Sequence, residues 1–559
     1  MFVKLIVLYL SLVTFATATL RSQSISELRK KSEAAKSNLL KRDVDPSTLY
    51  PTYNISVPID HFQTESQYEP HTNDTFSLRY WFDASNYQPG GPVIVLQSGE
   101  TDATERLVYL QKGLLAQLAQ ATNGIGVVLE HRYYGESWPT SDLSTKNLRF
   151  LTTEQALADE AYFAQNVVFA GFETYNLTAP NTAYIGYGGS YAGAFNAFLR
   201  TQYPDIFWGT ISSSGVVEAI YDYWQYYEPI RVYGPSECIS TTQTLTHIVD
   251  NILIGLNDTQ KTQELKAAFG LENVTYDNDF ANVLSGGIQG WQSRNWDPEV
   301  TDLSFSYYCG NITAHTILYP SVNTNASTST IESLITAGGY PNASSTLTTQ
   351  MQNYINWLNL TSVAPCTTSG ATQDSCFSNH NATFYAQDDI SQTWRSWPYQ
   401  YCTEWGYLQT GSGVPASQLP LISRTIDLEY LSLICNDAFN ISTPPDLSRI
   451  NRYGGFNISY PRLAFIDGEA DPWRPATPHA SPFIAGVRNR SSTTSEPFIL
   501  IEGAVHHWDE NGLFANETTD VLPPKPVRDT QREEVRFVKA WMEEWGDRVA
   551  GKRHLELMV

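Results

Sequence analysis

Basic residues are scarce in this chain of 559 residues. Lys and Arg number 35 against 58 Asp and Glu, which gives a net charge of −23 and a pI of about 4.8. Binding to nucleic acids or to anionic membranes needs a basic face, so we expect neither partner. Charged residues make up only 17% and hydrophobic residues 42%, which indicates a globular chain long enough for a large core plus an insertion or second domain.

Long apolar runs are lacking after the N-terminus. The run LIVLYLSLVTFA follows Lys4 and leads into Ala16-Thr17-Ala18, a small-x-small cleavage pattern. This predicts a secretory signal peptide over residues 1–18. A membrane anchor is the alternative, but the run is shorter than the roughly 20 residues of a comfortable span. We therefore expect no membrane anchor after cleavage.

The polar residues 19–42 end at the dibasic pair Lys41-Arg42. They are either a propeptide that a processing protease removes or an N-terminal tail in a solvated amphipathic helix. We exclude them from the catalytic fold.

Cysteine is rare, and no Cys-x-x-Cys pair occurs, which argues against a zinc site. Six cysteines are an even set, and in an exported chain they indicate three disulfides. Six cysteines allow 15 pairings, and the sequence alone selects none of them. We expect no metal and no cofactor.

Asn-x-Ser/Thr sequons are abundant by contrast. Together with a signal peptide, 14 of them indicate a glycosylated, exported protein. They are Asn54, Asn73, Asn176, Asn257, Asn273, Asn311, Asn325, Asn342, Asn359, Asn381, Asn440, Asn457, Asn489 and Asn516. We expect secretion, or delivery to an acidic vacuolar or lysosome-like compartment, of a monomer or homodimer.

Short apolar runs predict strands buried on both faces, as in a parallel sheet. They cover residues 92–98, 125–130, 182–187 and 208–214, and they return late in the chain at 462–468 and 497–503.

Apolar residues recur at helical spacing between these strands. They predict a helix from 151, with Thr153 near its start, another after Ser190, and an amphipathic helix around 532–545 near the end of the chain. The alternation is typical of an α/β fold. Residues 240–430 hold helical segments such as 250–270 instead, which we interpret as a mostly helical cap inserted into the sheet domain.

The stretch GYGGSYAGA places Ser190 between a predicted strand and a predicted helix. In α/β hydrolases the nucleophile stands on such a corner, where small neighbours let the backbone turn. Alanine replaces the second glycine of the G-x-S-x-G pattern here, followed by Gly193. A plain glycine turn with a capping serine is the alternative.

The α/β-hydrolase order is serine, then acid, then histidine. FIDGEADPW follows one late strand with Asp467 and Asp471, and FILIEGAVHHWD follows the next with His506 and His507. Both loops are expected at the sheet edge to which Ser190 also points.

These segments resemble the S28 family of serine peptidases, which includes prolyl carboxypeptidase, dipeptidyl peptidase II and fungal secreted prolyl peptidases. The matching motifs, from about residue 50 to the C-terminus, are EHRYYGES, LTTEQALADEAYF, GGSYAGA, ISSSGVVEA, CTEWGYLQT, DGEADPW and EGAVHHWD. The resemblance implies an α/β-hydrolase domain (43–225 and 441–559) with a helical cap (226–440) over the active site.

The resemblance also implies a triad. Ser190 would be the nucleophile, Asp471 rather than Asp467 the orienting acid, and His506 the base, with His507 left open because Val505 is an extra residue in this loop.

Two oxyanion donors are expected near the nucleophile. Tyr191 N–H would be one, because this residue follows the serine, and the loop at Gly99-Glu100 would supply the other. The family has Gly-Asn-Glu-Gly where this chain has Ser-Gly-Glu-Thr, which puts Gly99 in doubt.

The implied substrates are peptides cut after proline, whose ring needs an apolar slot with aromatic walls. Trp473, Trp405 and Tyr407 are the candidates, with ordinary core packing as the alternative for each. Glu130 either recognises a substrate amine or forms a structural pair with Arg132 or nearby backbone, and we favour the structural role.

For the disulfides, our working assignment pairs cysteines that flank one segment or close a short loop. It is Cys402–Cys435, Cys366–Cys376 and, by remainder, Cys238–Cys309.

Three functions compete: a serine peptidase acting after proline, a secreted carboxylesterase or lipase, and a non-catalytic binding protein. The complete set of serine, acid and histidine disfavours the third, and the EHRYYG and DPW motifs disfavour the second. Nothing in the sequence separates endopeptidase, carboxypeptidase and dipeptidyl-peptidase action.

Overall fold

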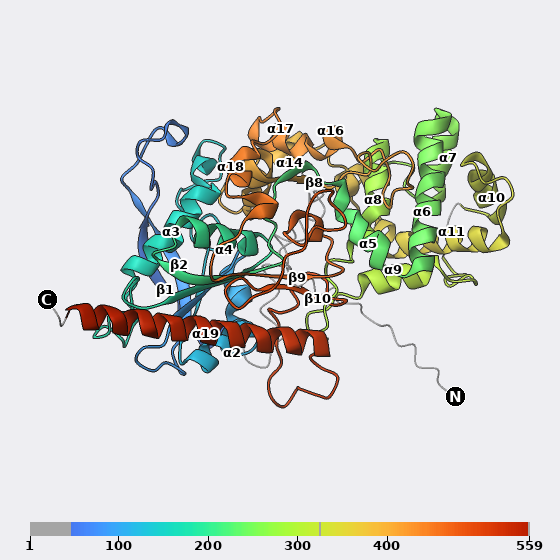
Figure 1. Ribbon diagram of the computed structural model, residues 1–559. Coiled ribbons are helices and arrows are strands. Elements are labelled where there is room, and N and C mark those ends of the chain that lie inside the picture. The colour runs from blue at the N-terminus through green and yellow to red at the C-terminus, as the bar shows by residue number, and fades with distance from the viewer. Residues whose placement is uncertain (1–45, 323–325, 557–559) are drawn as a thin grey trace, which may run out of the picture.

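A mixed eight-stranded sheet forms the centre of the protein, in the order β1-β2-β4-β3-β5-β6-β9-β10 (Figure 1). The computed structural model describes residues 46–322 and 326–556, so the expected signal peptide, the tail before residue 43 and Asn325 lie outside the described residues. The strands are β1 (Tyr53–Pro58), β2 (Thr75–Asp83), β3 (Val93–Gln97), β4 (Ile125–Leu129), β5 (Tyr184–Gly189), β6 (Phe207–Ser213), β9 (Leu463–Gly468) and β10 (Phe498–Ile501).

All six predicted strands are present, and β4, β3, β5, β6, β9 and β10 run parallel. The antiparallel pair β1 and β2, joined to the sheet through β4, was not predicted. Their residues are partly exposed, so they lack the continuous apolar runs that mark strands buried on both faces.

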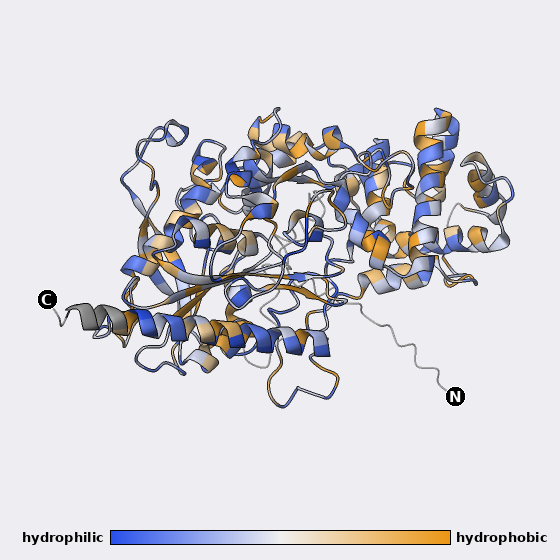
Figure 2. Cartoon of the chain, in the orientation of Figure 1, coloured by the Kyte–Doolittle hydropathy of each residue, from blue (hydrophilic) through white to orange (hydrophobic). Residues whose placement is uncertain are grey.

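Helices cover both faces of the sheet because its side chains alternate between two cores. In β3, Val93 and Val95 join one core with α3 (Thr153–Asn166) and α4 (Tyr191–Gln202), while Ile94 and Leu96 join the other with α2 (Leu114–Thr122) and α19 (Lys525–Glu556). Figure 1 shows α19 crossing the sheet domain, and Figure 2 shows apolar residues concentrated in the strands. The architecture is the predicted α/β-hydrolase fold.

The segment between β6 and β9 is mostly helical, and α6, α7, α10 and α11 lie away from the central sheet in Figure 1. Its longer helices are α5 (Tyr227–Tyr233), α6 (Ser236–Asp250), α7 (Thr259–Ala268), α8 (Asp277–Gln289), α9 (Ser304–Ile312), α10 (Thr328–Ala337) and α11 (Ser345–Leu358). Shorter ones follow: α12 (Ala364–Thr368), α13 (Gln373–Phe377), α14 (Ala382–Tyr385), α15 (Ser396–Gln400), α16 (Leu428–Leu431), α17 (Leu433–Phe439) and α18 (Ser448–Asn451). A two-stranded parallel pair joins β7 (Ile220–Asp222), at the start of this segment, to β8 (Gly406–Leu408). The exact domain limits stay predictions.

Helix α3 begins at Thr153, as expected, and the side chain of its cap Thr152 accepts from Gln155 N–H. Two other helix boundaries differ from the sequence expectation. The region 250–270 is broken at Asn257, which has φ +50°, and α7 restarts with Asp258 as its cap. The C-terminal helix extends well beyond 532–545 at both ends.

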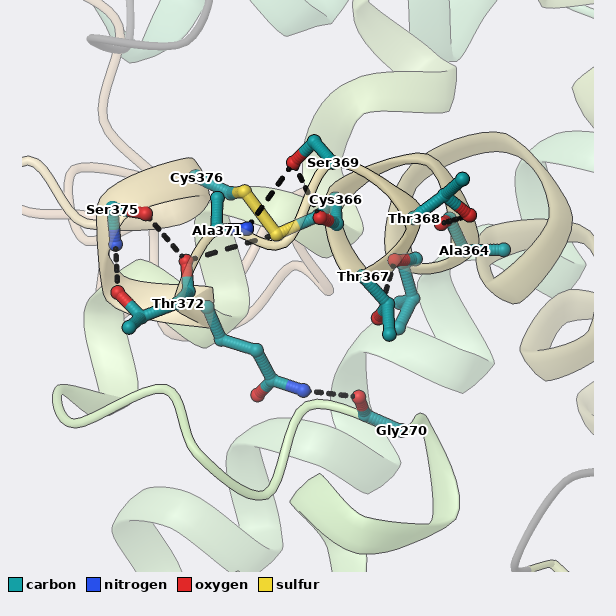
Figure 3. Close-up of a disulfide and its surroundings, with 12 residues drawn as sticks. Gly270, Ala364, Cys366, Thr367, Thr368, Ser369, Ala371, Thr372, Ser375 and Cys376 are labelled. Atoms are coloured by element: carbon teal, nitrogen blue, oxygen red, sulfur yellow. Dashed lines mark hydrogen bonds between the residues drawn. A yellow bond between two sulfur atoms is a disulfide. The ribbon is translucent and has the colours of Figure 1, made fainter.

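All three disulfides lie in the helical segment: Cys238–Cys309, Cys366–Cys376 and Cys402–Cys435. These are the pairs of the working assignment. Figure 3 shows Cys366–Cys376 closing a short loop, beside which a side-chain amide (Gln373 Nε2) donates to Gly270 O at 2.8 Å. The disulfides therefore brace the insertion and leave the sheet to its apolar cores.

Candidate active site

Ser190 stands on a strained corner between β5 and α4. Its φ of +63° and ψ of −124° are unusual for a residue with a side chain. The corner depends on its glycines, because a Cβ on Gly188 would lie 2.5 Å from Ala192 O, and one on Gly193 would lie 2.5 Å from Ser213 O. The backbone thus presents Ser190 at the carboxyl end of β5, where α4 begins.

His506 and Asp471 meet at the same edge of the sheet. Asp471 follows β9 and His506 follows β10, and the two strands are parallel neighbours. His506 Nδ1 lies 2.9 Å from Asp471 Oδ2 and 3.1 Å from Oδ1. Nδ1–H donating to the carboxylate leaves Nε2 as the basic nitrogen.

Ser190 Oγ and His506 Nε2 have no hydrogen-bond partner among the described residues, and neither has His507 Nε2. Ser190 and His506 are buried, at 1% and 4% exposure. Buried polar atoms are ordinarily bonded, and what favours His506 over His507 as the basic partner of Ser190 is the Asp471 carboxylate on its Nδ1.

The alternative acid and histidine have other partners. Asp467 Oδ2 contacts His479 Nδ1 at 2.6 Å, and His479 stacks on Phe498. His507 Nδ1 lies 2.9 Å from Glu510 Oε2. Its ring instead packs beneath the serine corner, since a Cβ on Gly189 would approach it within 3.0 Å.

The two expected oxyanion donors differ in availability. Tyr191 is the first residue of α4, so its N–H is one of the amides left without an intrahelical acceptor. Gly99 lies beside the corner, where its Cβ would be 3.6 Å from Ala192 Cβ. However, Gly99 N–H donates to the side chain of Gln97, so it is engaged in this structure.

The three aromatic candidates form one contiguous group beside the histidine. Trp473 lies 6.5 Å from His506 and 5.1 Å from Tyr407, ring centre to ring centre, and Tyr407 lies 6.1 Å from Trp405. All three are fully buried. Tyr407 OH and Trp405 Nε1 bond to protein groups, so core packing accounts for their polar ends.

His131 is a neighbour of the site that the sequence analysis did not single out. Its Nε2 lies 2.9 Å from Tyr191 OH and its Nδ1 2.7 Å from Arg132 O. Burial lowers the pKa of His131 to about 4, so it is neutral and fixes the Tyr191 ring below the corner. A histidine inside the EHRYYG motif was the available signal.

Glu130 has the structural role that we favoured, but with a different partner. It binds Arg79 through both carboxylate oxygens, at 2.6 and 2.7 Å, and accepts from Ser137 Oγ. Arg132 pairs instead with Asp159. Burial raises the pKa of Glu130 against the opposing effect of Arg79.

Most of the sequon asparagines are exposed, as glycosylation would require. Exposed asparagines are Asn54, Asn73, Asn176, Asn257, Asn273, Asn342, Asn440, Asn457, Asn489 and Asn516, and partly buried ones are Asn359 and Asn381. Asn311 is buried within α9 and donates to Tyr307 O at 2.7 Å.

Over residues 46–322 and 326–556, no helix combines the length and apolar character of a membrane span. The same residues contain no group of three or more His, Cys, Asp or Glu side chains that could hold a metal ion.

Comparison with known proteins identifies the family. The family model described as "Serine carboxypeptidase S28" matches residues 58–525. A "Probable extracellular serine carboxypeptidase" of Arthroderma benhamiae is 54% identical over 97% of this chain and 74% of that protein. "Serine protease vicPb" of Bipolaris victoriae is 32% identical over 78% of this chain and 81% of that protein. The chain therefore belongs to the S28 family of serine peptidases.

Proposed function

We propose that this serine-type peptidase is secreted and cleaves peptides after proline through an acyl-enzyme on Ser190. The observation that carries the catalytic part is the pairing of His506 Nδ1 with Asp471 while His506 Nε2 and Ser190 Oγ stay unbonded. His506 is the base, and Asp471 fixes its tautomer and stabilises the imidazolium.

In the first half-reaction Ser190 Oγ attacks the substrate carbonyl and its proton passes to His506 Nε2. The negative charge on the carbonyl oxygen falls beside Tyr191 N–H at the start of α4, where the free amide and the helix dipole stabilise it. His506 then donates the proton to the leaving amine. Water attacks the acyl-enzyme by the same path in reverse.

The preference for proline is supported by the family and by the aromatic group beside His506. The backbone N–H of Trp473 donates to Asp471 Oδ1 at 2.9 Å, and its indole lies 6.5 Å from the His506 ring, centre to centre. An indole held beside the proposed acid and base is placed to form a wall for a pyrrolidine ring.

Secretion is supported by the expected signal peptide, the exposed sequons and the three disulfides. The Arthroderma relative is itself named extracellular.

Two assays test the proposal. A fluorophosphonate probe should label the wild-type chain and fail to label Ser190→Ala. Peptides with an internal proline, matched peptides with alanine, and p-nitrophenyl esters should then be compared. A higher kcat/KM for the proline peptides supports the proposal. Efficient cleavage of esters alone, as expected for an esterase, would overturn it.

A further inference from the structure

Four tryptophans attach the connection between α8 and α9 to the two loops that carry the acid and the histidine. Trp291 Nε1 donates to Ala470 O at 2.8 Å, and Trp473 Nε1 donates to Gln292 Oε1 at 2.9 Å. These two bonds flank Asp471.

The remaining two bonds join the connection to the histidine loop. Trp508 Nε1 donates to Arg294 O at 2.9 Å, and Trp296 Nε1 donates to Trp508 O at 2.8 Å. Trp508 follows His507 directly. Residues 291–296 of the helical segment are thereby held against both loops of the proposed triad.

Arg294 is partly buried and lies within this attached segment. It differs from other buried or partly buried arginines. Arg200, Arg395 and Arg490 all donate to backbone carbonyls. Within the described ranges, no carboxylate or other acceptor bonds the Arg294 guanidinium. Burial lowers the pKa of Arg294, and no acidic group opposes that effect.

The Arg294 guanidinium packs against two aromatic rings, and its N–H donors have no hydrogen-bond acceptor among the described residues. It lies 4.3 Å from the centre of the Trp291 ring and 5.8 Å from that of Phe305. Both rings are buried at 2% exposure. Stacking on an indole orients the donor fork of an arginine without consuming its N–H groups. That fork matches a carboxylate, which accepts two parallel hydrogen bonds.

We propose that Arg294 binds the C-terminal carboxylate of the substrate and makes this peptidase a carboxypeptidase. The chain carries a net charge of −23, so a free peptide carboxylate is repelled by the protein as a whole, and a local cation beside the triad loops offsets that repulsion. A partly buried cation without a partner is costly to the folded protein. A bound carboxylate removes that cost and places the last peptide bond at Ser190.

This inference rests on the proposed function, and its test separates the two. Two N-blocked peptides with proline in the penultimate position are compared, one ending in a free acid and one in an amide. The enzymes are wild type, Arg294→Met, Arg294→Lys and the control Arg532→Met, whose side chain is 77% exposed on α19. Methionine keeps apolar packing on Trp291 and removes the charge together with the donor fork.

We expect the wild type and the control to prefer the free acid, and Arg294→Met to lose roughly 10- to 100-fold in kcat/KM on the acid alone, mainly through KM. Arg294→Lys should recover part of the loss, since it restores charge without the fork. Equal losses on acid and amide, or no loss on either, would overturn the role of Arg294.

Fluorophosphonate labelling of Arg294→Met provides the separate readout. Labelling at the wild-type rate together with an unchanged acid preference refutes the inference and leaves the Ser190 mechanism standing. Absence of labelling in the wild type refutes the mechanism itself.

Discussion

His506 and His507 are adjacent in the chain, yet their imidazoles face different carboxylates. His506 Nδ1 lies 2.9 Å from Asp471 Oδ2, and His507 Nδ1 lies 2.9 Å from Glu510 Oε2. His507 has a positive φ of +35°, and the two rings lie 4.6 Å apart, centre to centre, with their planes tilted by 57°. The pair thus divides into one histidine that Asp471 orients, which is the proposed base, and one packed under the serine corner.

Substitution of the two histidines should have very unequal effects. His506→Gln should lower kcat by about 10⁴-fold, as loss of the base does in a serine triad, and His507→Gln by about tenfold or less. Steady-state kinetics on a proline peptide measures both. If His507→Gln were the more damaging variant, the assignment of the base would have to be exchanged.

The buried pair of Arg79 and Glu130 should matter for stability rather than chemistry. Glu130→Ala leaves Arg79 buried without its bidentate partner and should lower the free energy of unfolding by about 3–5 kcal/mol. Chemical denaturation measures the change. Glu136→Ala is the matched control, because Glu136 also binds Arg79 but its side chain is 74% exposed, and it should cost about 1 kcal/mol or less. Similar losses in both variants would contradict this account.

Two buried carboxyls below the corner should make the protein less stable as the pH rises. Asp509 accepts from Tyr187 OH and Ser213 Oγ, and burial raises its pKa to about 6. Glu534 on α19 is buried beside it, and burial and then Asp509 raise the pKa of Glu534 well above its usual range.

The direction of this pH dependence follows from the number of protons that the folded and unfolded states bind. Between pH 4 and 6 folded Asp509 holds a proton that the unfolded chain releases, even though hydrogen bonds from Ser213 and Tyr187, and then the nearby His507, oppose the shift. The free energy of unfolding therefore falls through this window, and by roughly 3 kcal/mol in all from below it to above it for a shift of that size. Glu534→Gln removes one of the two acids and should stabilise the protein at pH 7 far more than at pH 4.

Thermal unfolding at the two pH values measures this difference. Glu533→Gln is the control, since Glu533 is partly exposed and pairs with Arg536. A gain for Glu534→Gln that is equal at pH 4 and pH 7 would show that the carboxyl pair is not the source.

Asn311 should remain unmodified although it lies in a sequon. A transferase needs an accessible asparagine, and Asn311 is 6% exposed within α9. Peptide mapping by mass spectrometry after enzymatic deglycosylation should find conversion at Asn457, which is exposed, and none at Asn311. Conversion at Asn311 would mean that glycosylation precedes the folding of α9.

The parallel strands and the serine corner could be predicted because their signals are local. A continuous apolar run marks a strand buried on both faces, and the glycines around Ser190 mark a tight turn. The strands β1 and β2 were not predicted because both are partly exposed and lack such a run.

Partners that depend on tertiary contacts could not be predicted. Glu130 and Arg132 are two residues apart, yet each pairs with an arginine or aspartate from a distant segment. The same holds for Gly99, whose N–H is taken by the Gln97 side chain. A motif can be recognised from residues adjacent in the sequence, but the hydrogen-bond and ion-pair partners of its polar atoms depend on tertiary packing.

The placement of β9 beside β6 has a consequence for synthesis on the ribosome. Ser213 and Ile466 are register partners, although the whole helical segment is translated between them. The proposed nucleophile therefore emerges early, while the proposed acid and base emerge only after that segment is complete. Until β9 and β10 join the sheet, the nascent chain carries Ser190 without the proposed proton acceptor, so the proposed mechanism requires β9 and β10 to be made before hydrolysis begins.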